Sequence, residues 1–440
     1  MMKSKKWNIV LALLLMGTFT VQAQITGKPN FGKIAIIDAT IHTVTEGTIQ
    51  NGVITLDGEK IEYVGTDRSK VGDDYTVIEA TGKHVFPGFM DSGTSLGLVE
   101  VNAVPVTVDN REVGNVNPNM LAFTAFNPHS ASIPVTRVSG VTHVITAPQG
   151  GLVSGQAALM DLWGYSPDSM AIDATAGMVL NWPSAQSRGW GPRNPEQAEK
   201  RYKEAVRNLD KWLDNARFYD QMMNEFEADP SGKTKPEKNQ QLQAMRALVQ
   251  GETPLIIAVS SEKDILNAIE WSSHEDNSSL NIVFAGVEEG WRVAEKIAEA
   301  GIPCLVSTLY TPVRSYDHIH RPYENPAALM KAGVKVAIMT GEVENVRNLP
   351  FNAGYAAAYG MGTEEAIKAV TINPAEIFGV SDRLGSLEIG KQANLFISSG
   401  DPFEPLSQIE QVFIKGYQIP MDSRHIQLFE EFLDRDATQE

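Results

Sequence analysis

The chain has 440 residues and a formal net charge of −17, with 42% hydrophobic and 21% charged residues. This balance excludes a disordered, collagen-like or polytopic membrane protein. The acidic charge disfavours binding to nucleic acid or to an anionic membrane, because their phosphates repel it. The single cysteine, Cys304, excludes an intrachain disulfide framework and a cysteine-based zinc cluster.

The first residues have the pattern of a secretory signal peptide. Lys3, Lys5 and Lys6 precede a short apolar run, and small residues at 21–23 form a cleavage signal. The run is interrupted by polar residues and is short for a bilayer, which disfavours a membrane anchor. We expect residues 1–23, which hold three lysines and no acidic residue, to be removed. The mature chain would carry a net charge of −20 and be exported, to the periplasm or outside the cell, with no membrane span.

Beyond this segment, short β-rich runs bracket a central series of apolar runs and amphipathic stretches. Residues 33–85 contain four β-rich runs, with the hairpin signal Asp57-Gly58 between two of them, and a similar block returns near the C-terminus. The apolar runs of the central series lie at 141–147, 254–260, 281–286, 302–307 and 334–341, and helical patterns at 264–271 and 291–301 follow two of them. This alternation predicts an α/β fold with a parallel sheet, and its length fits a (β/α)8 barrel.

Residues 195–250 interrupt the alternation with a charged, helix-rich insertion. It could be a lid or partner-docking element, but a pair of solvated outer helices is the favoured interpretation. The expected organisation is a signal peptide (1–23), the first half of a β-sandwich (24–85), a barrel (86–380) with the insertion, the second half of the sandwich (381–422) and a C-terminal helix (423–440).

Three motifs resemble those of the amidohydrolase superfamily. Residues 87–97 read PGFMDSGTSLG, similar to the family's first barrel strand, P-G-hydrophobic-I-D-x-H-x-H. Residues 371–375 read TINPA, and residues 385–395 read GSLEIGKQANL, similar to T-x-N-P-A and G-x-L-x-x-G-K-x-A-D-L. The resemblance is strongest to imidazolonepropionase-like members. It implies a TIM-like barrel with a composite β-sandwich, and a hydrolase of non-peptide carbon–nitrogen bonds in cyclic amides or dipeptide-like substrates.

The resemblance also implies one or two divalent metals, commonly zinc, bound at the barrel mouth to activate water. The family's ligand positions, however, hold other residues in this chain, and the strand-four ligand has no evident counterpart. Glycine and alanine have no side-chain donor and serine is a poor zinc ligand, so the usual metal centre is not expected; zinc or another divalent metal would be needed only if the chain is active. The residues at the family positions are Gly93, Ser95, Ala258 or Ser260, Ala285 and Gly341.

Other residues could take over part of this role. His318 and His320 form an H-x-H that could bind metal with Glu342 or Glu344, but a polar loop with two solvated histidines is the favoured interpretation. For Glu289, stabilisation of a helix N-terminus is the simpler alternative to a ligand contact. The glycines of the loop at 149–156 would allow either close approach of a ligand or a tight turn, and both remain open. The candidate ligand-binding residues are Gln149, Gly150, Gly151, Ser154, Gln156, Glu289 and Glu342.

Nucleophilic catalysis has no support, because no G-x-S-x-G elbow is present and no histidine pairs recognisably with a serine. His143 is expected to be a satisfied core histidine and Cys304 an inert buried thiol. Two functions remain. The chain is either a hydrolase with a relocated or reduced metal site, or an exported pseudoenzyme that binds a small molecule or forms a homo-oligomer or hetero-oligomer with an active paralogue. The missing ligands favour the pseudoenzyme.

Overall fold

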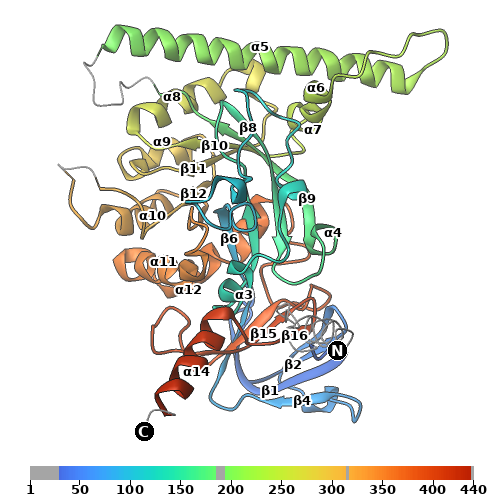
Figure 1. The fold of residues 1–440 in the computed structure, drawn as a ribbon, viewed down its shortest axis with the longest axis vertical. Helices are drawn as coiled ribbons and strands as arrows, with labels where there is room; N and C mark the ends of the chain where they lie inside the picture. Colours follow the sequence, from blue (N-terminus) through green and yellow to red (C-terminus); the bar gives the residue numbers. More distant parts are fainter. Residues whose placement is uncertain (1–28, 185–193, 314–316, 438–440) are drawn as a thin grey trace, which may run out of the picture.

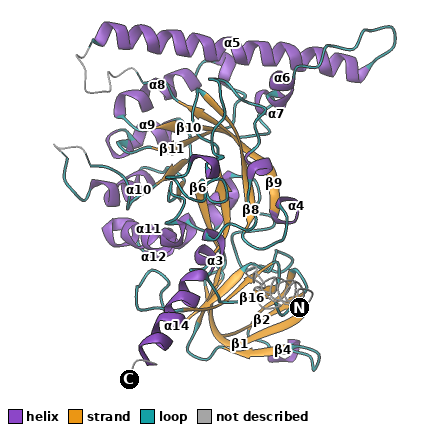
Figure 2. Cartoon of the chain, in the orientation of Figure 1, coloured by secondary structure: helices purple, strands orange, loops and turns teal. Residues whose placement is uncertain are grey.

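The computed structural model describes residues 29–184, 194–313 and 317–437, so the signal-peptide segment lies outside the described residues. The described residues form two eight-stranded sheets. One is curved into a barrel with helices around it, and the other is a smaller accessory sheet below the barrel in Figures 1 and 2. No helix of the described ranges is long and apolar enough to cross a membrane.

The accessory sheet is built from both ends of the chain. β5 pairs with β14, so strands about 300 residues apart in sequence lie side by side. The Asp57-Gly58 signal is confirmed as the turn between antiparallel β2 and β3, with Gly58 at φ 58°. The strands of this sheet are β1 (Lys33–His42), β2 (Thr48–Asp57), β3 (Lys60–Gly65), β4 (Thr76–Glu79), β5 (His84–Pro87), β14 (Leu395–Ser398), β15 (Ile409–Ile414) and β16 (Tyr417–Ile419).

The second sheet forms a nearly closed barrel, which confirms the predicted α/β fold. Its order follows the chain from β6 to β13, and the last strand returns to the first. At this seam Gly341 N donates to Gly93 O over 2.9 Å. The strands are β6 (Phe89–Thr94), β7 (Val141–Thr146), β8 (Val153–Asp161), β9 (Ala171–Asn181), β10 (Leu255–Val259), β11 (Ile282–Gly286), β12 (Cys304–Val306) and β13 (Val336–Ile338).

One strand departs from the all-parallel expectation, because β8 runs antiparallel to both β7 and β9. Only residues 147–152 connect β7 to β8, and a parallel pair needs a crossover of a dozen or more residues. Gly150 and Gly151 lie in this connection with φ of 87° and 67°, a conformation that favours glycine. The glycines therefore make a tight turn, one of the two alternatives left open by the sequence.

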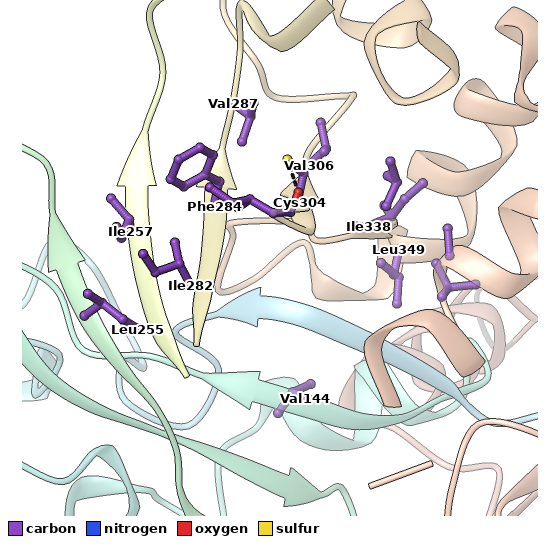
Figure 3. Close-up of a cluster of buried hydrophobic side chains, with 14 of the residues drawn as sticks. Val144, Leu255, Ile257, Ile282, Phe284, Val287, Cys304, Val306, Ile338 and Leu349 are labelled. Carbon is purple, nitrogen blue, oxygen red and sulfur yellow. Dashed lines mark hydrogen bonds between the residues drawn. The ribbon is translucent and has the colours of Figure 1, made fainter. Parts of the chain in front are cut away.

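Helices cover the outside of the barrel (Figure 2). Strand and helix side chains share one buried apolar cluster, in which Figure 3 shows Ile257, Phe284 and Cys304 of the strands and Leu349 of a helix. Burial raises the pKa of the Cys304 thiol, which keeps it protonated and unreactive. The helices are α2 (Ala122–Ala125), α3 (Ser132–Arg137), α4 (Pro167–Met170), α5 (Pro195–Ala228), α6 (Gln240–Ala244), α7 (Arg246–Val249), α8 (Glu262–Ser272), α9 (Ala294–Glu299), α10 (Arg321–Lys331), α11 (Leu349–Ala356), the π-helical turn η6 (Ala357–Met361), α12 (Thr363–Ala369), α13 (Ile372–Ile377) and α14 (Arg424–Ala437). Short 3₁₀ turns are η1 (Arg68–Lys70), η2 (Pro105–Thr107), η3 (Glu275–Asn277), η4 (Gly290–Arg292) and η5 (Val346–Asn348).

The helix-rich insertion is one long helix followed by two short ones, rather than the expected pair. α5 has 34 residues and lies across the top of the molecule in Figure 1. Leu209 and Leu213 are buried on its inner side, and Asp210 accepts a hydrogen bond of 2.8 Å from Trp271 Nε1 of α8. The inner face of α5 is therefore packed onto the barrel helices, while its other face is exposed.

A cluster of buried polar residues joins the barrel to the accessory sheet; we call it the junction cluster (His143, Asp161, Asn394 and Lys415). Lys415 Nζ lies 2.7 Å from Asp161 Oδ2, and His143 Nε2 lies 3.3 Å from Asp161 Oδ1. His143 Nε2 also lies 2.9 Å from Asn394 Nδ2. Burial lowers the pKa of His143 to about 3, so the ring is neutral. His143 is thus a satisfied core histidine, as its apolar strand pattern predicts.

Candidate functional site at the barrel mouth

A pocket of about 360 Å³ opens where the carboxyl ends of the parallel barrel strands meet; we call it the mouth pocket. Its walls are mostly apolar, with Ile145, Val179, Ile256 and Leu305 from four different strands. Among the described residues that line it, none has a carboxylate, imidazole, thiol, ammonium or guanidinium group. The hydrogen-bonding groups of the lining are therefore uncharged hydroxyls, amides and backbone atoms.

The mouth pocket contains the sequence positions that correspond to the metal ligands of the amidohydrolase superfamily. For strand five, the structure places Ala258 in the pocket, whereas Ser260 is not part of its lining. The fourth barrel strand, for which the sequence analysis identifies no ligand candidate, ends at Asn181, and this residue also lines the pocket. A polar residue that ends an apolar run, as in the sequence MVLN, is the signal that could have found it. The family positions found in the lining are Gly93, Ser95, Ala258, Ala285 and Gly341.

The loop between β7 and β8 forms one rim of the mouth pocket and is held by side-chain hydrogen bonds. Gln149 Nε2 donates to Ser95 Oγ over 3.1 Å. Asn181 Nδ2 lies 2.9 Å from both the Gly151 carbonyl oxygen and Ser154 Oγ. Gln149 Nε2 uses one of its two N–H donors in this bond, so the Gln149 amide can still both donate to and accept from a bound molecule. The Asn181 amide directs its nitrogen at the loop, and its carbonyl oxygen can accept from a bound molecule.

Ser92 is the most unusual polar residue of the lining. It is fully buried, and its Oγ has no hydrogen-bond partner among the described residues. A buried hydroxyl without a partner costs free energy in the absence of a ligand. No sequence signal distinguishes Ser92, because it lies between Asp91 and Gly93 within the family motif.

Asp91 lies behind the pocket and closes the barrel. Its Oδ1 accepts hydrogen bonds from Thr340 N (3.1 Å) and Gly93 N (3.0 Å), and its Oδ2 accepts from Thr340 Oγ1 (2.5 Å). Burial raises the pKa of Asp91 to about 7, against the lowering effect of these hydrogen bonds. Asp91 therefore ties β6 to the end of β13 and does not line the mouth pocket.

The other candidates from the loop at 149–156 and the two glutamates have mostly structural contacts. Gly150 lines the pocket, whereas Gly151, Ser154 and Gln156 do not. Gln156 Nε2 donates to Pro118 O over 3.0 Å, away from the mouth.

Glu289 and Glu342 also lie outside the lining of the mouth pocket. Glu289 is 7% exposed, and its Oε2 accepts a hydrogen bond of 2.8 Å from Glu262 N at the start of α8, which fits the helix-terminus interpretation. The Glu342 carbonyl accepts from Ser95 N over 3.3 Å, so the backbone of Glu342 helps to close the barrel.

His318 and His320 lie at the start of α10, outside the mouth pocket. Their ring centroids are 4.9 Å apart, and His320 Nδ1 lies 3.2 Å from the Tyr359 hydroxyl. Within residues 29–184, 194–313 and 317–437, no group of three His, Cys, Asp or Glu residues is arranged to hold a metal ion. The structure thus brings no third ligand to this pair in the part that it describes.

Comparison with known proteins places this geometry in a family. The profile of the Amidohydrolase family matches residues 256–419. A solved amidohydrolase from Thermotoga maritima MSB8 is 26% identical, with a TM-score of 0.76 over 88% of this chain and 99% of that chain. The family model, the relatives and the shared fold together support the amidohydrolase superfamily as the family of this chain.

Two imidazolonepropionases are also similar in sequence to this chain. That of Shouchella clausii is 22% identical over 403 residues, or 82% of each chain, and that of Syntrophobacter fumaroxidans is 31% identical over 108 residues, or 24% of each chain. A solved molinate hydrolase shares the fold at 17% identity, with a TM-score of 0.55. The chain spans about a quarter of the Syntrophobacter relative, so that protein's activity does not carry over directly.

The divalent metal of the superfamily does not fit the residues of this mouth. The five positions that would hold its ligands carry no imidazole or carboxylate, and the rest of the described lining supplies none. The space is also filled. A Cβ atom on Gly93 would lie 2.9 Å from Met339 Sδ, so the Met339 side chain occupies the volume into which a histidine at position 93 would extend. Both the chemistry and the packing differ from those of a metal centre.

Proposed function

We propose that this chain is a non-catalytic amidohydrolase homologue that holds a small uncharged ligand in the mouth pocket. The observation that carries the proposal is the lining itself, in which neutral polar groups stand among apolar walls. A charged ligand would lose water on entering without gaining an opposite charge, which is costly. A neutral molecule with N–H or O–H donors could use the carbonyl oxygens of Gln149 and Asn181.

The same lining gives no support to hydrolysis of carbon–nitrogen bonds. Hydrolysis needs an activated water or an activated nucleophile, and both need a metal or a base close to the reacting atom. Ser92 and Ser95 lie in the pocket, but their described neighbours include no histidine, lysine or carboxylate side chain in the lining. Cyclic amides and dipeptides, the substrates implied by the resemblance, are therefore candidates for binding or for exclusion rather than for turnover.

Metal content and turnover test the proposal together. The purified protein would be dialysed against zinc or manganese, its bound metal measured by mass spectrometry, and its activity assayed on cyclic amides and dipeptides. We expect less than 0.1 metal per chain and no turnover above the uncatalysed rate. Stoichiometric metal with turnover that His318→Ala/His320→Ala abolishes would refute the proposal and favour a relocated metal site.

A second role, contact with another subunit, is favoured by α14. This helix exposes a stripe of large apolar side chains, including Phe429 (63% exposed) and Phe432 (58% exposed). Such a stripe on a soluble chain is typical of a protein–protein contact. We propose that α14 packs against a second amidohydrolase subunit, either a copy of this chain or an active paralogue.

Light scattering coupled to size exclusion tests this contact. We expect an assembly larger than a monomer for the chain alone or mixed with a paralogue, and its loss in Phe429→Glu/Phe432→Glu. Gln427→Glu on the polar side of the same helix is the matched control and should leave the assembly intact. Monomers under all these conditions would eliminate the subunit role.

Export is tested separately, by mass spectrometry of the protein from the cell envelope, which should begin at Gln24.

A further inference from the structure

A larger cavity of about 730 Å³ lies on the flank of the barrel, between α11 with η6 and the loop that follows β14; we call it the side pocket. Its volume lies within the range of small-molecule sites. It shares no lining residue with the mouth pocket, so it is independent of the function proposed above.

Aromatic rings form two sides of the side pocket. Tyr355 and Tyr359 come from the helical side, and Phe403 comes from the loop. Tyr355 is 42% exposed, and its ring lies 4.8 Å from the ring of Tyr323, which supports it from behind. Phe403 packs against Phe89 of the barrel, with ring centroids 6.1 Å apart. These contacts fix the ring faces before any ligand arrives.

The backbone is irregular where it presents these rings. Tyr359 has non-helical torsions (φ −97°, ψ 28°) within η6, and Gly360 follows with φ 109°. π-helical turns often occur at functional sites. At Gly354 a Cβ atom would lie 3.1 Å from Phe403 Cβ, so a glycine lets the loop approach α11 closely. Local geometry thus shapes this pocket on both sides.

The side pocket is also acidic. Asp401 and Glu404 line it, and none of the described lining residues is Lys, Arg or His. Neither carboxylate forms an ion pair with a basic residue of the described ranges, although Asp401 Oδ1 accepts a hydrogen bond of 2.9 Å from Phe403 N. The charge of Asp401 acts on His42, but burial and His84 lower the pKa of His42 to about 4, so that ring is neutral. The described lining therefore carries two carboxylates and no basic side chain.

We propose that the side pocket binds an organic cation with an alkylated ammonium group. Tyrosine and phenylalanine faces attract such cations through their ring quadrupoles, and an aromatic cage with nearby carboxylates is the usual arrangement for quaternary ammonium ligands. A small inorganic cation would need six or more oxygen ligands, which the aromatic walls do not supply. The two carboxylates would repel an anion, and a neutral apolar molecule would gain no electrostatic attraction from them.

A matched pair of probes tests the charge preference. Choline and its uncharged isostere 3,3-dimethylbutan-1-ol have nearly the same shape, and their binding can be compared by isothermal titration calorimetry and saturation-transfer NMR. We expect choline to bind at least tenfold more tightly than the isostere. Equal binding of the two probes, or no binding of choline at millimolar concentration, would overturn the proposal.

Variants locate the binding. Tyr355→Leu removes one exposed ring, and Asp401→Asn/Glu404→Gln removes both carboxylates; each should weaken choline binding at least fivefold. Glu252→Gln/Glu295→Gln removes two carboxylates outside the side pocket and is the matched control for net charge. Circular dichroism and thermal unfolding verify that each variant is folded, and Tyr355→Phe, which keeps the ring, should bind like the wild type. Binding that is unchanged in both pocket variants would place the cation elsewhere and refute the assignment.

Discussion

The mouth pocket and the junction cluster are both buried polar regions of the same barrel, but they are built in opposite ways. The described lining of the mouth has no ionisable side chain, whereas the junction cluster packs the buried Asp161 and His143 against Lys415, whose side chain is 17% exposed. In this chain ionisable groups persist where they connect the barrel to the accessory sheet and are absent where superfamily chemistry would need them. This contrast is the basis of our proposal that the chain keeps the fold of the superfamily without its metal chemistry.

The junction should be the more sensitive of the two regions. Lys415→Met would leave the fully buried Asp161 without its cation, and removal of one partner of a buried pair costs about 3–5 kcal/mol. Burial already raises the pKa of Asp161 to about 6, and loss of Lys415 would raise it further. A carboxyl whose folded pKa is raised contributes stability at low pH and loses it as pH rises, so the defect should be larger at pH 8 than at pH 5. Urea unfolding at both pH values measures it.

Two controls make this result specific to the junction. The double variant Asp161→Asn/Lys415→Met removes both charges and should recover much of the lost free energy of unfolding. Lys296→Met, which breaks an exposed ion pair with Glu299, should change stability little. If Lys415→Met behaves like the exposed control, the junction cluster does not hold the two sheets together.

The mouth region has its own buried ionisable group, Asp91, which lies directly behind the pocket. Its titration tests whether this region, like the junction cluster, carries a buried charge. Its folded pKa of about 7 lies well above the usual range of an aspartate, so Asp91 contributes stability at acidic pH, and this contribution is lost as pH rises to about 7. Asp91→Asn removes this titration. We expect the difference in unfolding free energy, wild type minus variant, to fall by at most about 4 kcal/mol between pH 4 and pH 8.

Chemical denaturation over a pH series provides this difference, and it cancels the contributions of His42 and His143, which are the same in both proteins. A pH-independent difference would mean that Asp91 is ionised throughout and that its three hydrogen bonds outweigh its burial. The result therefore decides whether the mouth region carries a buried charge at neutral pH.

The filled volume beside Gly93 predicts a smaller effect. Gly93→His would push against the Met339 side chain in the wall of the mouth pocket, and overpacking costs at most about 1–3 kcal/mol. Met339→Ala should relieve this clash, so the two substitutions should couple favourably in a double-mutant cycle. Additive effects would show that the histidine escapes into open space, and the packing argument against a metal centre would then fail while the argument from missing ligands would stand.

The sequence predicts more of the fold than of the mouth pocket, for physical reasons. Apolar runs bounded by glycine and proline identify β7 and β10–β13, and the Asp57-Gly58 turn identifies the hairpin of β2 and β3, because these signals are local. The reversed direction of β8 depends on the shortness of one connection, which the alternation pattern does not reveal. One long helix, α5, followed by the short α6 and α7 likewise takes the place of the expected helix pair.

For the site, the family motif correctly indicates which positions face the mouth, since Gly93, Ser95 and Gly341 all line the pocket. It does not indicate what fills the space instead. Met339 and Asn181 are far apart in sequence but line the same pocket. Only the tertiary structure brings them together, so local sequence patterns do not reveal it. The sequence does not predict the side pocket either, because its aromatic rings come from a helix, a π-helical turn and a distant loop.

The smallest predicted effect concerns two serines near the mouth that differ only in their partners. Ser92 Oγ is buried without a hydrogen bond, so Ser92→Ala should leave stability unchanged or raise it by up to about 1 kcal/mol. Ser154 Oγ donates to the Gly150 carbonyl and accepts from Asn181, so Ser154→Ala should cost about 1 kcal/mol. If Ser92→Ala is instead the more destabilising of the two in urea unfolding, its hydroxyl serves the fold. If Ser92→Ala instead stabilises the protein, the buried hydroxyl of Ser92 lowers the stability of the fold. A hydroxyl that lowers stability without a ligand is consistent with a role in ligand binding.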